Sequence, residues 1–299
     1  MTDTKSAFAA IVGKANVGKS SLLNLLLGEK IAIVSSKPQT TRTKIMGVLT
    51  EGDLQLVFLD TPGFHKPKTK LSSHMNKVVT DSIGDVDMAL FLVEPKGKLT
   101  EEEMALIESF RAKKLPVLLI INKTDLVEKE DIALRIAEIS PLYDFAAVIP
   151  VSVSEQKGIK SLMEELREHA PFGPHYFPDD TLTDQPERTI AAEMIREKIL
   201  LNMRDEIPHG TAVTIEKMKE RPDNSIIDME ATIYCERESH KGMIIGKGGS
   251  MLKKIASDAR MEMEDFFDTK INLKCWVKVK DDWRNNENQI KNLGFHYDD

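Results

Sequence analysis

The stretch that decides the fold of this 299-residue chain is Gly13-Lys14-Ala15-Asn16-Val17-Gly18-Lys19-Ser20. It fits the pattern G-x-x-x-x-G-K-[S/T], whose backbone N–H groups surround a phosphate. An apolar run over 8–12 predicts a strand before it, and leucines within 20–27 predict a helix after it. A strand, a glycine-rich loop and a helix in this order predict a binding site for a nucleoside triphosphate.

Each residue type in this loop has a physical role. Glycine at 13 and at 18 lets the backbone wrap closely around a phosphate, where a Cβ would obstruct it. The N-terminus of the following helix adds positive charge. Lys19 would reach the β- and γ-phosphates, and the hydroxyl of Ser20 would bind Mg²⁺. The alternative is a glycine-rich turn without a ligand, which the flanking strand and helix disfavour.

The bulk composition suits a soluble globular protein of two domains, with 41% apolar and 30% charged residues. Cys235 and Cys275 lack C-x-x-C spacing, so we expect reduced thiols in the cytosol and neither a disulfide nor a zinc site. We also expect no signal peptide and no membrane-spanning helix. A net charge of −7 argues against indiscriminate coating of nucleic acid but allows a local basic face.

Two polar segments are predicted to respond to the nucleotide. The first, 35–43, has no clear period and contains Thr40 and Thr41. Either hydroxyl could bind Mg²⁺ while a γ-phosphate is present, and we favour Thr41. The second is Asp60-Thr61-Pro62-Gly63, which follows a predicted strand hairpin over 44–59. Asp60 would hold Mg²⁺ through water, and the Gly63 N–H would contact the γ-phosphate.

A third motif predicts the base that is bound. Buried strands are predicted over 88–93 and 117–121, and the second runs into Asn122-Lys123-Thr124-Asp125. The Asp125 carboxylate can accept both the N1–H and the N2 amine of guanine as a charge-assisted pair. Adenine offers neither donor and would leave the carboxylate unpaired, which costs several kcal/mol at the order-of-magnitude level (~1–3 or more). The motif therefore favours GTP over ATP.

A last strand over 148–151 leads into Ser152-Val153, where a backbone N–H could contact guanine O6. This signal is the weakest, because its usual form is Ser-Ala. An amphipathic helix is predicted over 155–170. Strands that alternate with helices predict an α/β fold, with a mostly parallel sheet, helices on both faces and one antiparallel hairpin. The strand ends would bring the phosphate, metal and base motifs to one edge of the sheet.

We expect a GTP-binding domain over 1–172, a proline-rich linker over 173–186 and a second, α+β domain over 187–299. The elements expected in the second domain are a helix over 187–202, strands over 212–218 and 226–235, a helix over 251–261 and a last strand over 271–279. Together with the apolar lead-in over 243–245, these elements resemble the α-β-β-α-α-β order of a type II KH domain.

A glycine-rich loop in the second domain predicts contact with nucleic acid. Gly246-Lys247-Gly248-Gly249 fits the G-x-x-G clamp of KH domains, which holds the backbone of about four nucleotides. The glycines let the sugar-phosphate chain approach, Lys247 supplies charge, and Ser250 is expected to cap the next helix. The expected RNA contacts are Ile245, Gly246, Lys247, Gly248, Gly249 and Lys253. The alternatives are a flexible turn and, for the surrounding lysines, an ordinary solvated surface.

Taken together, GKANVGKS, QTTR, DTPG and NKTD, followed by IIGKGG and Trp283-Arg284, resemble the Era family of bacterial Ras-like GTPases over essentially the whole chain. The resemblance implies slow hydrolysis of GTP to GDP and binding of single-stranded RNA near the 3′ end of 16S rRNA. It also implies a role in maturation of the small (30S) ribosomal subunit, and a monomer in the cytoplasm that associates peripherally with the inner face of the cell membrane.

The expected nucleotide contacts are 13–20 in the phosphate loop, Asp60, Thr61, Pro62, Gly63, Phe64, Asn122, Lys123, Asp125, Ser152 and Val153. We expect Lys19, Thr41, Gly63 and Asn16 to assist hydrolysis, and Ser20, Thr41 and Asp60 to bind Mg²⁺. Phe64 stands where many GTPases carry a glutamine that orients water, so turnover below ~1 s⁻¹ is expected. By resemblance to related GTPases, Asn16 could help bind K⁺.

GTP is expected to order both responsive segments and thereby to change the affinity for RNA. Two alternatives stay open. One is an RNA-binding protein whose first domain does not respond to nucleotide. The other is a GTPase that signals to proteins and uses its second domain as a docking surface.

Overall fold

The computed structural model describes residues 4–37, 39–63, 69–204, 207–222 and 225–295. Its contacts divide the chain into two compact units. The first unit consists of 1–32, 41–67 and 72–184, and the second of 33–40, 68–71 and 185–299. The domain limits at 172 and 187 stay a prediction.

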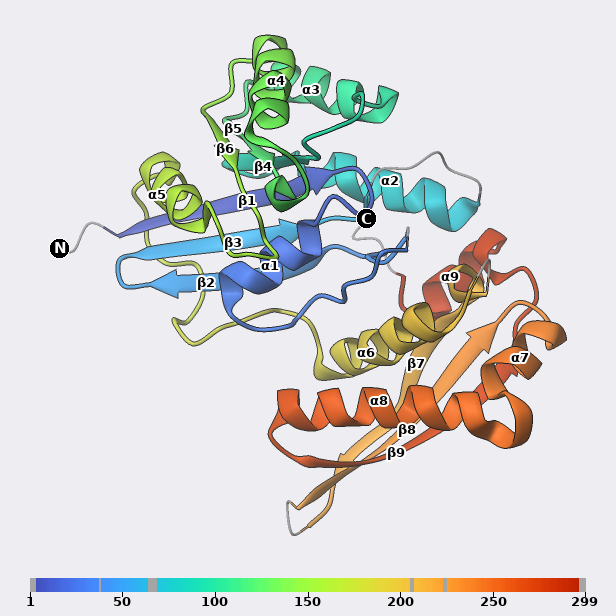
Figure 1. Cartoon of the computed structure of the whole chain (residues 1–299). Coiled ribbons are helices and arrows are strands. Elements are labelled where there is room, and N and C mark those ends of the chain that lie inside the picture. The colour runs from blue at the N-terminus through green and yellow to red at the C-terminus, as the bar shows by residue number, and fades with distance from the viewer. Residues whose placement is uncertain (1–3, 38, 64–68, 205–206, 223–224, 296–299) are drawn as a thin grey trace. The chain divides into compact units, whose positions relative to one another are not determined.

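A six-stranded sheet in the order β2-β3-β1-β4-β5-β6 forms the centre of the first unit (Figure 1). Its strands are β1 (Lys5–Gly13), β2 (Ile45–Glu51), β3 (Leu54–Asp60), β4 (Met88–Val93), β5 (Val117–Ile121) and β6 (Ala147–Pro150). β2 pairs antiparallel with β3, and all other neighbours pair parallel. The structure confirms the mostly parallel sheet with one hairpin.

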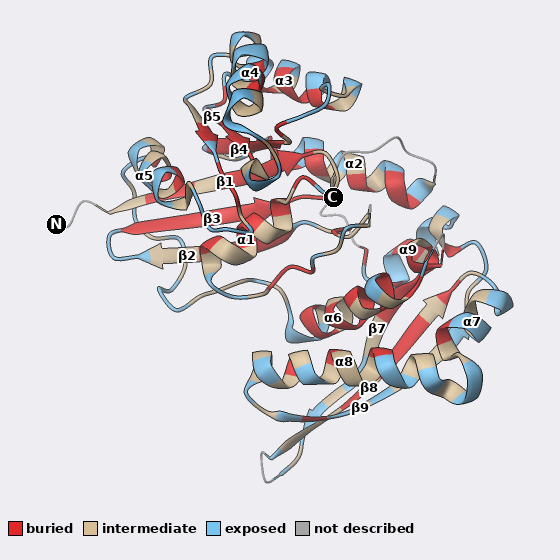
Figure 2. Cartoon of the chain, viewed as in Figure 1, coloured by how far each residue is buried: buried red, intermediate tan, exposed pale blue. Residues whose placement is uncertain are grey.

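Helices cover both faces of this sheet. They are α1 (Lys19–Leu27), α2 (Lys70–Ser82), α3 (Glu101–Lys113), α4 (Lys129–Ile139) and α5 (Ile159–His169). On one face, Val79 of α2, Phe110 of α3 and Ile139 of α4 pack against apolar side chains of β1, β4 and β5. Figure 1 shows α1 and α5 on the other face. The central strands are therefore buried on both sides (Figure 2), which explains their continuous apolar runs.

Helix α5 begins later than its periodicity predicts. The sequence indicates a helix over 155–170, whereas the structure places it at Ile159–His169. Gly158 precedes it with φ 78, and a Cβ at this position would lie 2.4 Å from the Pro150 carbonyl oxygen. A left-handed glycine stops the helix from extending backwards, because such a residue lies outside the right-handed helical region.

The proline-rich stretch predicted as a linker packs against the first sheet over part of its length. The Gln55 side chain accepts the N–H groups of Tyr176 (2.7 Å) and Phe177 (3.0 Å) and donates to the Phe177 carbonyl (2.9 Å). Further along, the Val48 N–H donates to the Leu182 carbonyl at 2.8 Å. These hydrogen bonds satisfy backbone groups that no helix or strand would satisfy, so this stretch is ordered.

The second unit contains a three-stranded sheet in the order β7-β8-β9. Its elements are α6 (Glu187–Asn202), β7 (Ala212–Glu220), β8 (Ile226–Cys235), α7 (Glu238–Ile245), α8 (Ser250–Phe267), β9 (Lys270–Val279) and α9 (Glu287–Asn292). β7 and β8 pair antiparallel, and β8 and β9 pair parallel. Short 3-10 turns in the two units cover Thr124–Leu126, Ser140–Leu142, Pro208–Gly210, Lys247–Gly249 and Trp283–Asn285.

Helices α6, α7 and α8 pack their apolar residues against one face of this sheet. Helix α8 is longer than the predicted 251–261, because Ile255, Ala259 and Met263 continue the buried stripe. After β9, Trp283 is fully buried and donates from Nε1 to the Gly210 carbonyl at 2.9 Å. None of the described helices in either unit is both long and apolar enough to cross a bilayer.

Candidate functional site

The carboxyl ends of the parallel strands bring the first unit's motifs to one edge of the sheet. The β1–β3 register sets Ile11 beside Asp60, and the β4–β5 register sets Val93 beside Ile121. The loops that leave these strands therefore start side by side. The antiparallel β2 starts opposite Asp60, so the end of the polar segment before it reaches the same edge.

Close packing explains both glycines at the ends of the phosphate loop. A Cβ on Gly13, at φ 148, would lie 2.4 Å from the Leu92 carbonyl oxygen. A Cβ on Gly18, at φ 104, would lie 2.2 Å from Nδ2 of Asn122. Side chains rarely adopt such backbone angles and real Cβ atoms do not approach so closely, so both positions require glycine. The loop is thus held between β4 and the base motif.

Lys19 lies inside the loop rather than in solvent. Its side chain is buried, and Nζ donates to the carbonyls of Gly13 (3.2 Å) and Lys14 (3.0 Å). Burial lowers the pKa of Lys19 to about 8, although the carboxylates of Asp60 and Glu103 act in the opposite direction. The nearby carboxylates offset only part of the cost of burying the Lys19 ammonium. An anionic ligand beside Lys19 would therefore be favoured, because it would stabilise the charged form.

Three oxygen atoms converge next to Lys19. The Ser20 hydroxyl donates to Oδ2 of Asp60 at 2.6 Å and lies 2.8 Å from the Thr41 hydroxyl. The other carboxylate oxygen of Asp60 is buried and has no hydrogen-bond partner among the described residues. Thr40, the alternative, donates to the Lys37 carbonyl instead (2.6 Å). Hard oxygen donors with one buried acceptor to spare fit Mg²⁺.

The buried carboxyl of Asp60 is itself strained electrostatically. Burial raises the pKa of Asp60 to about 6, and Lys19 and the Ser20 hydroxyl offset only part of this effect. Asp60 and Lys19 therefore both carry charges that the apolar interior disfavours. A phosphate beside Lys19 and a cation beside Asp60 would each relieve this cost.

The base motif is held together by its own side chains. Asn122 donates from Nδ2 to the Val17 carbonyl (2.9 Å) and accepts the Val153 N–H at Oδ1 (3.2 Å). It thereby ties the phosphate loop to the loop after β6. The Val153 N–H, expected to face guanine O6, is directed at Asn122 in this structure. The Ser152 hydroxyl donates to Asp125 (2.6 Å) and holds the pKa of that carboxyl below its usual value.

Glu94, which directly follows β4, joins the two motifs and was not predicted from the sequence. Its carboxylate bridges Lys14 of the phosphate loop (2.5 Å) and Lys123 of the base motif (2.7 Å). Although burial acts the other way, these two lysines together lower the pKa of Glu94. An acid immediately after a buried strand was the available signal, but only the sheet topology shows that two lysines flank it.

The polar segment before Thr41 packs on α6, within the second unit. The Val34 N–H donates to Glu197 at 2.8 Å, and the buried Arg196 donates to the Thr40 carbonyl. Lys37 donates to two carbonyls at the end of α6.

Of the other predicted nucleotide contacts, Gly63 lies against Ala15, since a Cβ on Gly63 would be 2.5 Å from the Ala15 Cα. Phe64 lies outside the described residues.

The G-x-x-G loop of the second unit has a different character. Gly246, Gly248 and Gly249 have φ of 72, 60 and 80, which favour glycine. A Cβ on Gly248 or Gly249 would meet nothing within 4 Å, so the space over these two residues is open, whereas a Cβ on Gly246 would lie 2.7 Å from the Met251 Cβ. Ser250 is not the helix cap that the sequence predicts: Gly249 is the N-cap, no side-chain cap bond forms, and Ser250 is the first helical residue. The left-handed Gly249 takes the position where a capping serine would otherwise stand.

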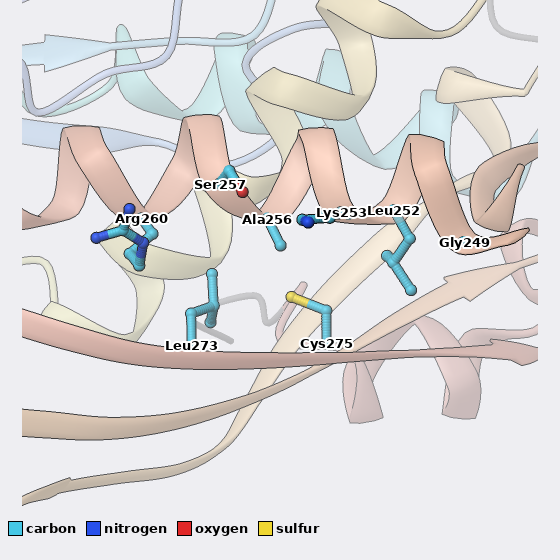
Figure 3. Close-up of a pocket in the computed structure, with 8 residues that line it drawn as sticks. All are labelled: Gly249, Leu252, Lys253, Ala256, Ser257, Arg260, Leu273 and Cys275. Carbon is cyan, nitrogen blue, oxygen red and sulfur yellow. The ribbon is translucent and has the colours of Figure 1, made fainter.

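A groove of about 350 Å³ runs between α8 and β9, beginning at the G-x-x-G loop (Figure 3). Its lining residues are Gly249, Leu252, Lys253, Ala256, Ser257, Arg260, Leu273 and Cys275. Of these, only Gly249 and Lys253 were predicted as RNA contacts. The others come from the helix face and strand face that the fold brings together. Burial raises the pKa of the Cys275 thiol to about 12, so this residue contributes a neutral, apolar surface.

Metal sites built from His, Cys, Asp and Glu do not occur among the described residues, since no group of three such side chains gathers there. The two cysteines are free thiols, as the sequence predicts. Any cation at the first site must therefore be held by hydroxyls, a single carboxylate and the phosphates of a ligand, which agrees with the oxygen atoms of Ser20, Thr41 and Asp60.

Comparisons with known proteins agree with these two sites. The profile of the 50S ribosome-binding GTPase family matches residues 8–123, and that of the KH domain matches residues 206–284. The GTPase Era of Ruminiclostridium cellulolyticum is 52% identical over 291 residues, covering 97% of both chains. The GTPase Era of Clostridioides difficile is 48% identical over 296 residues, covering 98% of this chain and 99% of the relative.

Solved structures give the same result. A variant of Aquifex aeolicus Era bound to GDP·AlF4⁻ is 34% identical and matches with a TM-score of 0.94 over 98% of this chain and 100% of that chain. A structure of Era with MgGDPNP and nucleotides 1506–1542 of 16S ribosomal RNA matches with the same score, identity and coverage. The sequence and the fold together show that this chain belongs to the Era family of GTPases.

Proposed function

We propose that this chain is a GTP-hydrolysing switch that binds the single-stranded 3′ region of 16S rRNA and assists maturation of the small ribosomal subunit. The observation that carries the nucleotide part is the buried cluster of Lys19, Ser20, Thr41 and Asp60 beside the base motif. Its spare cationic and anionic groups suit a triphosphate with Mg²⁺. The RNA part rests on the G-x-x-G loop and its groove, and on the RNA present in the related Era structure.

In this proposal the phosphate loop, 13–20, surrounds the phosphates, and Lys19 neutralises charge on the β- and γ-oxygens. Ser20, Thr41 and Asp60 would hold Mg²⁺, which would neutralise phosphate charge when bound. Thr61, Pro62 and Gly63 line the γ-phosphate side, and Asn122, Lys123, Asp125, Ser152 and Val153 line the base side. Support comes from the convergence of these elements at one edge of the sheet.

Hydrolysis requires a positioned water and a counter-charge, and Lys19 of the phosphate loop supplies part of the counter-charge. We propose that Asn16 helps to hold K⁺, which would add positive charge next to the γ-phosphate. Asn16 is exposed at φ 64, an angle that asparagine tolerates, so its side chain stands at the rim of the loop. Equal hydrolysis rates in K⁺ and Na⁺ buffers would contradict this part.

The link between nucleotide and RNA would run along the backbone from Thr40 to Thr41. Arg196 of α6 holds the Thr40 carbonyl, and the next residue, Thr41, contacts Ser20. A nucleotide that orders Thr41 must therefore act on a segment that belongs to the second unit. Coupling of this kind is reciprocal, so RNA would also change the affinity for nucleotide.

For location and assembly, we propose a cytoplasmic monomer that associates peripherally with the inner face of the cell membrane. This part rests on the family resemblance.

Calorimetry with the full chain tests the nucleotide part. Asp125→Asn should weaken GDP binding at least tenfold, because the carboxylate that pairs with two guanine donors is lost. Binding of xanthosine diphosphate should improve, since xanthine carries an acceptor in place of the N2 amine. Lys160→Gln serves as the control, because it removes one charge of the opposite sign at an exposed residue of α5. It should leave the binding of both nucleotides unchanged. Unchanged GDP binding in Asp125→Asn would overturn the proposed base recognition.

Binding of the 16S rRNA fragment with GDP and with a non-hydrolysable GTP analogue tests the coupling. The wild-type protein should show different affinities in the two states, and Arg196→Ala should bring them together. Lys247→Asp with Gly248→Asp should abolish RNA binding in both states by charge repulsion and leave nucleotide binding intact. If the chain is a switch, Arg196→Ala still binds RNA, but its affinity no longer depends on the nucleotide. An RNA-binding protein that does not respond to nucleotide would show equal affinities in the two states already in the wild type.

A further inference from the structure

The open face of the second sheet carries a continuous basic and aromatic row. On β9, the odd-numbered residues from 271 to 279 are apolar and pack toward α8 and the unit's core. The even-numbered residues point to the opposite face, because side chains alternate along a strand. They are Lys270, Asn272, Lys274, Trp276 and Lys278, and Lys280 follows the strand. No acid occurs in this row.

The centre of this row is free to bind a ligand. Lys274 and Lys278 flank Trp276 on the same face and are exposed, and the side chain of neither makes an ion pair or hydrogen bond to another described residue. Trp276 is 45% exposed, an unusual state for the largest apolar side chain, while the chain's other tryptophan, Trp283, is fully buried. An edge strand explains lysines, which prevent strand pairing, but it does not explain a half-exposed indole between them.

The acids on the neighbouring strands have partners of their own, although the register also sets Glu230 beside Lys274. Asp228 on β8 accepts two hydrogen bonds from Arg221 and one from Asn272. Glu230 lies 3.8 Å from Lys217. Glu216 accepts hydrogen bonds from Thr214 and Tyr234.

A second aromatic ring lies near the end of the row. The register pairs Tyr234 of β8 with Lys278, and the Lys280 ammonium lies over the Tyr234 ring at 5.0 Å.

We propose that this face is a second contact surface for single-stranded RNA, in which a base stacks on Trp276 and the adjacent phosphates bind Lys274 and Lys278. An aromatic ring with cations on both sides is what unpaired nucleic acid requires, since bases stack on rings and phosphates need charge. Successive same-face residues on a strand stand about 6.6 Å apart, which lets one nucleotide reach both kinds of group.

The surface is continuous with the groove on which the proposed function depends. Leu273 and Cys275 line that groove from one side of β9, and Trp276 and Lys274 lie on the other side of the same strand. Since β9 is the edge strand, an RNA that leaves the groove has only one strand to cross. The clamp holds about four nucleotides, so a longer RNA has further bases to place. This inference rests on the proposed RNA binding of the groove.

Two RNA probes separate the two surfaces. The long probe is the fragment 1506–1542 of 16S rRNA, and the short probe is the six-nucleotide piece of it that binds the full chain most tightly. For the long probe, Trp276→Ala should weaken binding about tenfold, the size of one base–aromatic stack. Lys274→Gln with Lys278→Gln should lower the slope of log affinity against log salt by about 1.4. Neither variant should change binding of the short probe, which also shows that the variants fold.

One control removes two lysines outside the proposed surface, and another keeps an aromatic ring at 276. Lys129→Gln with Lys160→Gln removes two exposed lysines of the first unit and equals the double variant in net charge. Trp276→Phe keeps a ring and should retain most of the affinity for the long probe. In the wild type the long probe, but not the short one, should quench tryptophan fluorescence. Trp276→Phe should abolish that quenching, because Trp283 is buried.

Equal long-probe affinity in the wild type, Trp276→Ala and Lys274→Gln/Lys278→Gln would overturn the inference, as expected if the face binds a protein or only solvent. The inference would also be overturned if Trp276→Ala weakened binding of a base-paired long probe but not of a single-stranded one. Failure of the wild type to bind either probe would instead refute the groove, and with it the proposed function.

Discussion

The chain contains two glycine-lysine loops that precede a helix, 13–20 and 246–249, and they differ in how much of the loop is enclosed. In the first, Lys19 is buried on two carbonyls, and a Cβ on either terminal glycine would strike another residue. In the second, Lys247 is exposed, and a Cβ on Gly248 or Gly249 would meet open space. A ligand of fixed size favours a closed cradle, whereas a polymer that enters and leaves requires an open one.

The energetic consequences also differ. The closed loop keeps two charges where the interior disfavours them, which lowers the pKa of Lys19 to about 8 and raises that of Asp60 to about 6. The open loop instead leads into a groove that offers apolar surface beside lysine and arginine. The first site is therefore prepared for one charged ligand, while the second binds through many weaker contacts.

The largest test of this contrast compares two glycine substitutions. Gly18→Ala should reduce GDP affinity at least a hundredfold, because its Cβ would displace Asn122 and distort the loop. Gly248→Ala should cost only the strain of a left-handed alanine, about 1–2 kcal/mol, and lower RNA affinity less than about tenfold. Calorimetry with GDP and fluorescence anisotropy with RNA measure the two effects. Comparable losses in both variants would remove the distinction between the loops.

The pH dependence of the nucleotide-free protein is the next test. Because its folded pKa is raised from 3.8 to about 6, Asp60 contributes stability that is present below pH 3.8 and lost as the pH rises through 6. The stability of the wild type relative to Asp60→Asn should thus fall by about 2 kcal/mol between pH 4 and pH 7.

Urea unfolding followed by circular dichroism at several pH values measures this difference. Addition of Mg²⁺ and GDP to the wild type should reverse the loss at neutral pH. A difference between the two proteins that does not vary with pH would show that Asp60 is not electrostatically strained.

A smaller effect is expected at Glu94, which bridges the phosphate loop and the base motif. Glu94→Gln should weaken GDP binding about fivefold to tenfold, since two partly exposed ion pairs contribute about 1 kcal/mol together. GDP release followed by stopped flow should become faster by a similar factor. If the bridge acts as a unit, Lys14→Met in the Glu94→Gln background adds little further, and full additivity would argue against it.

The smallest effect concerns thiol chemistry in the open groove. Burial raises the pKa of Cys275 to about 12, so almost no thiolate exists at neutral pH. Iodoacetamide should modify it far more slowly than a free thiol, and bound RNA should slow the reaction further. Mass spectrometry of the modified peptide measures the rate, with the buried Cys235 as the internal reference. Rapid modification in the presence of RNA would show that the groove is not where RNA binds.

Much of the fold followed from the order of elements in the chain. Strands over 88–93 and 117–121 and the helix over 187–202 were predicted with the limits that the structure shows, because each has a strong period or a continuous apolar run. Two of the errors lie at glycines. Gly158 delays α5, and Gly249 replaces Ser250 as the cap of α8, because a left-handed backbone overrides the local preference of neighbouring residues.

The candidate site was predicted less evenly. Motifs that are contiguous in the chain, such as Gly13–Ser20, could be recognised directly, since a short loop is shaped mainly by its own residues. Glu94 and most of the groove lining, such as Ala256 and Leu273, could not, since each depends on a partner far away in the chain. Which of Thr40 and Thr41 lies beside Ser20 also needed coordinates, because adjacent residues differ only in which way they point.

The sequence by itself determined the class of fold, the two ligand loops and the preference for guanine, because backbone conformation and hydrogen-bonding groups are local properties of a few residues. Only the tertiary structure decided which side chains are buried and which atoms meet. It placed Asp60 and Lys19 where water is excluded, and it set Trp276 on the exposed face of β9. Burial and contact are properties of the packed chain, and they set the charges and surfaces on which binding depends.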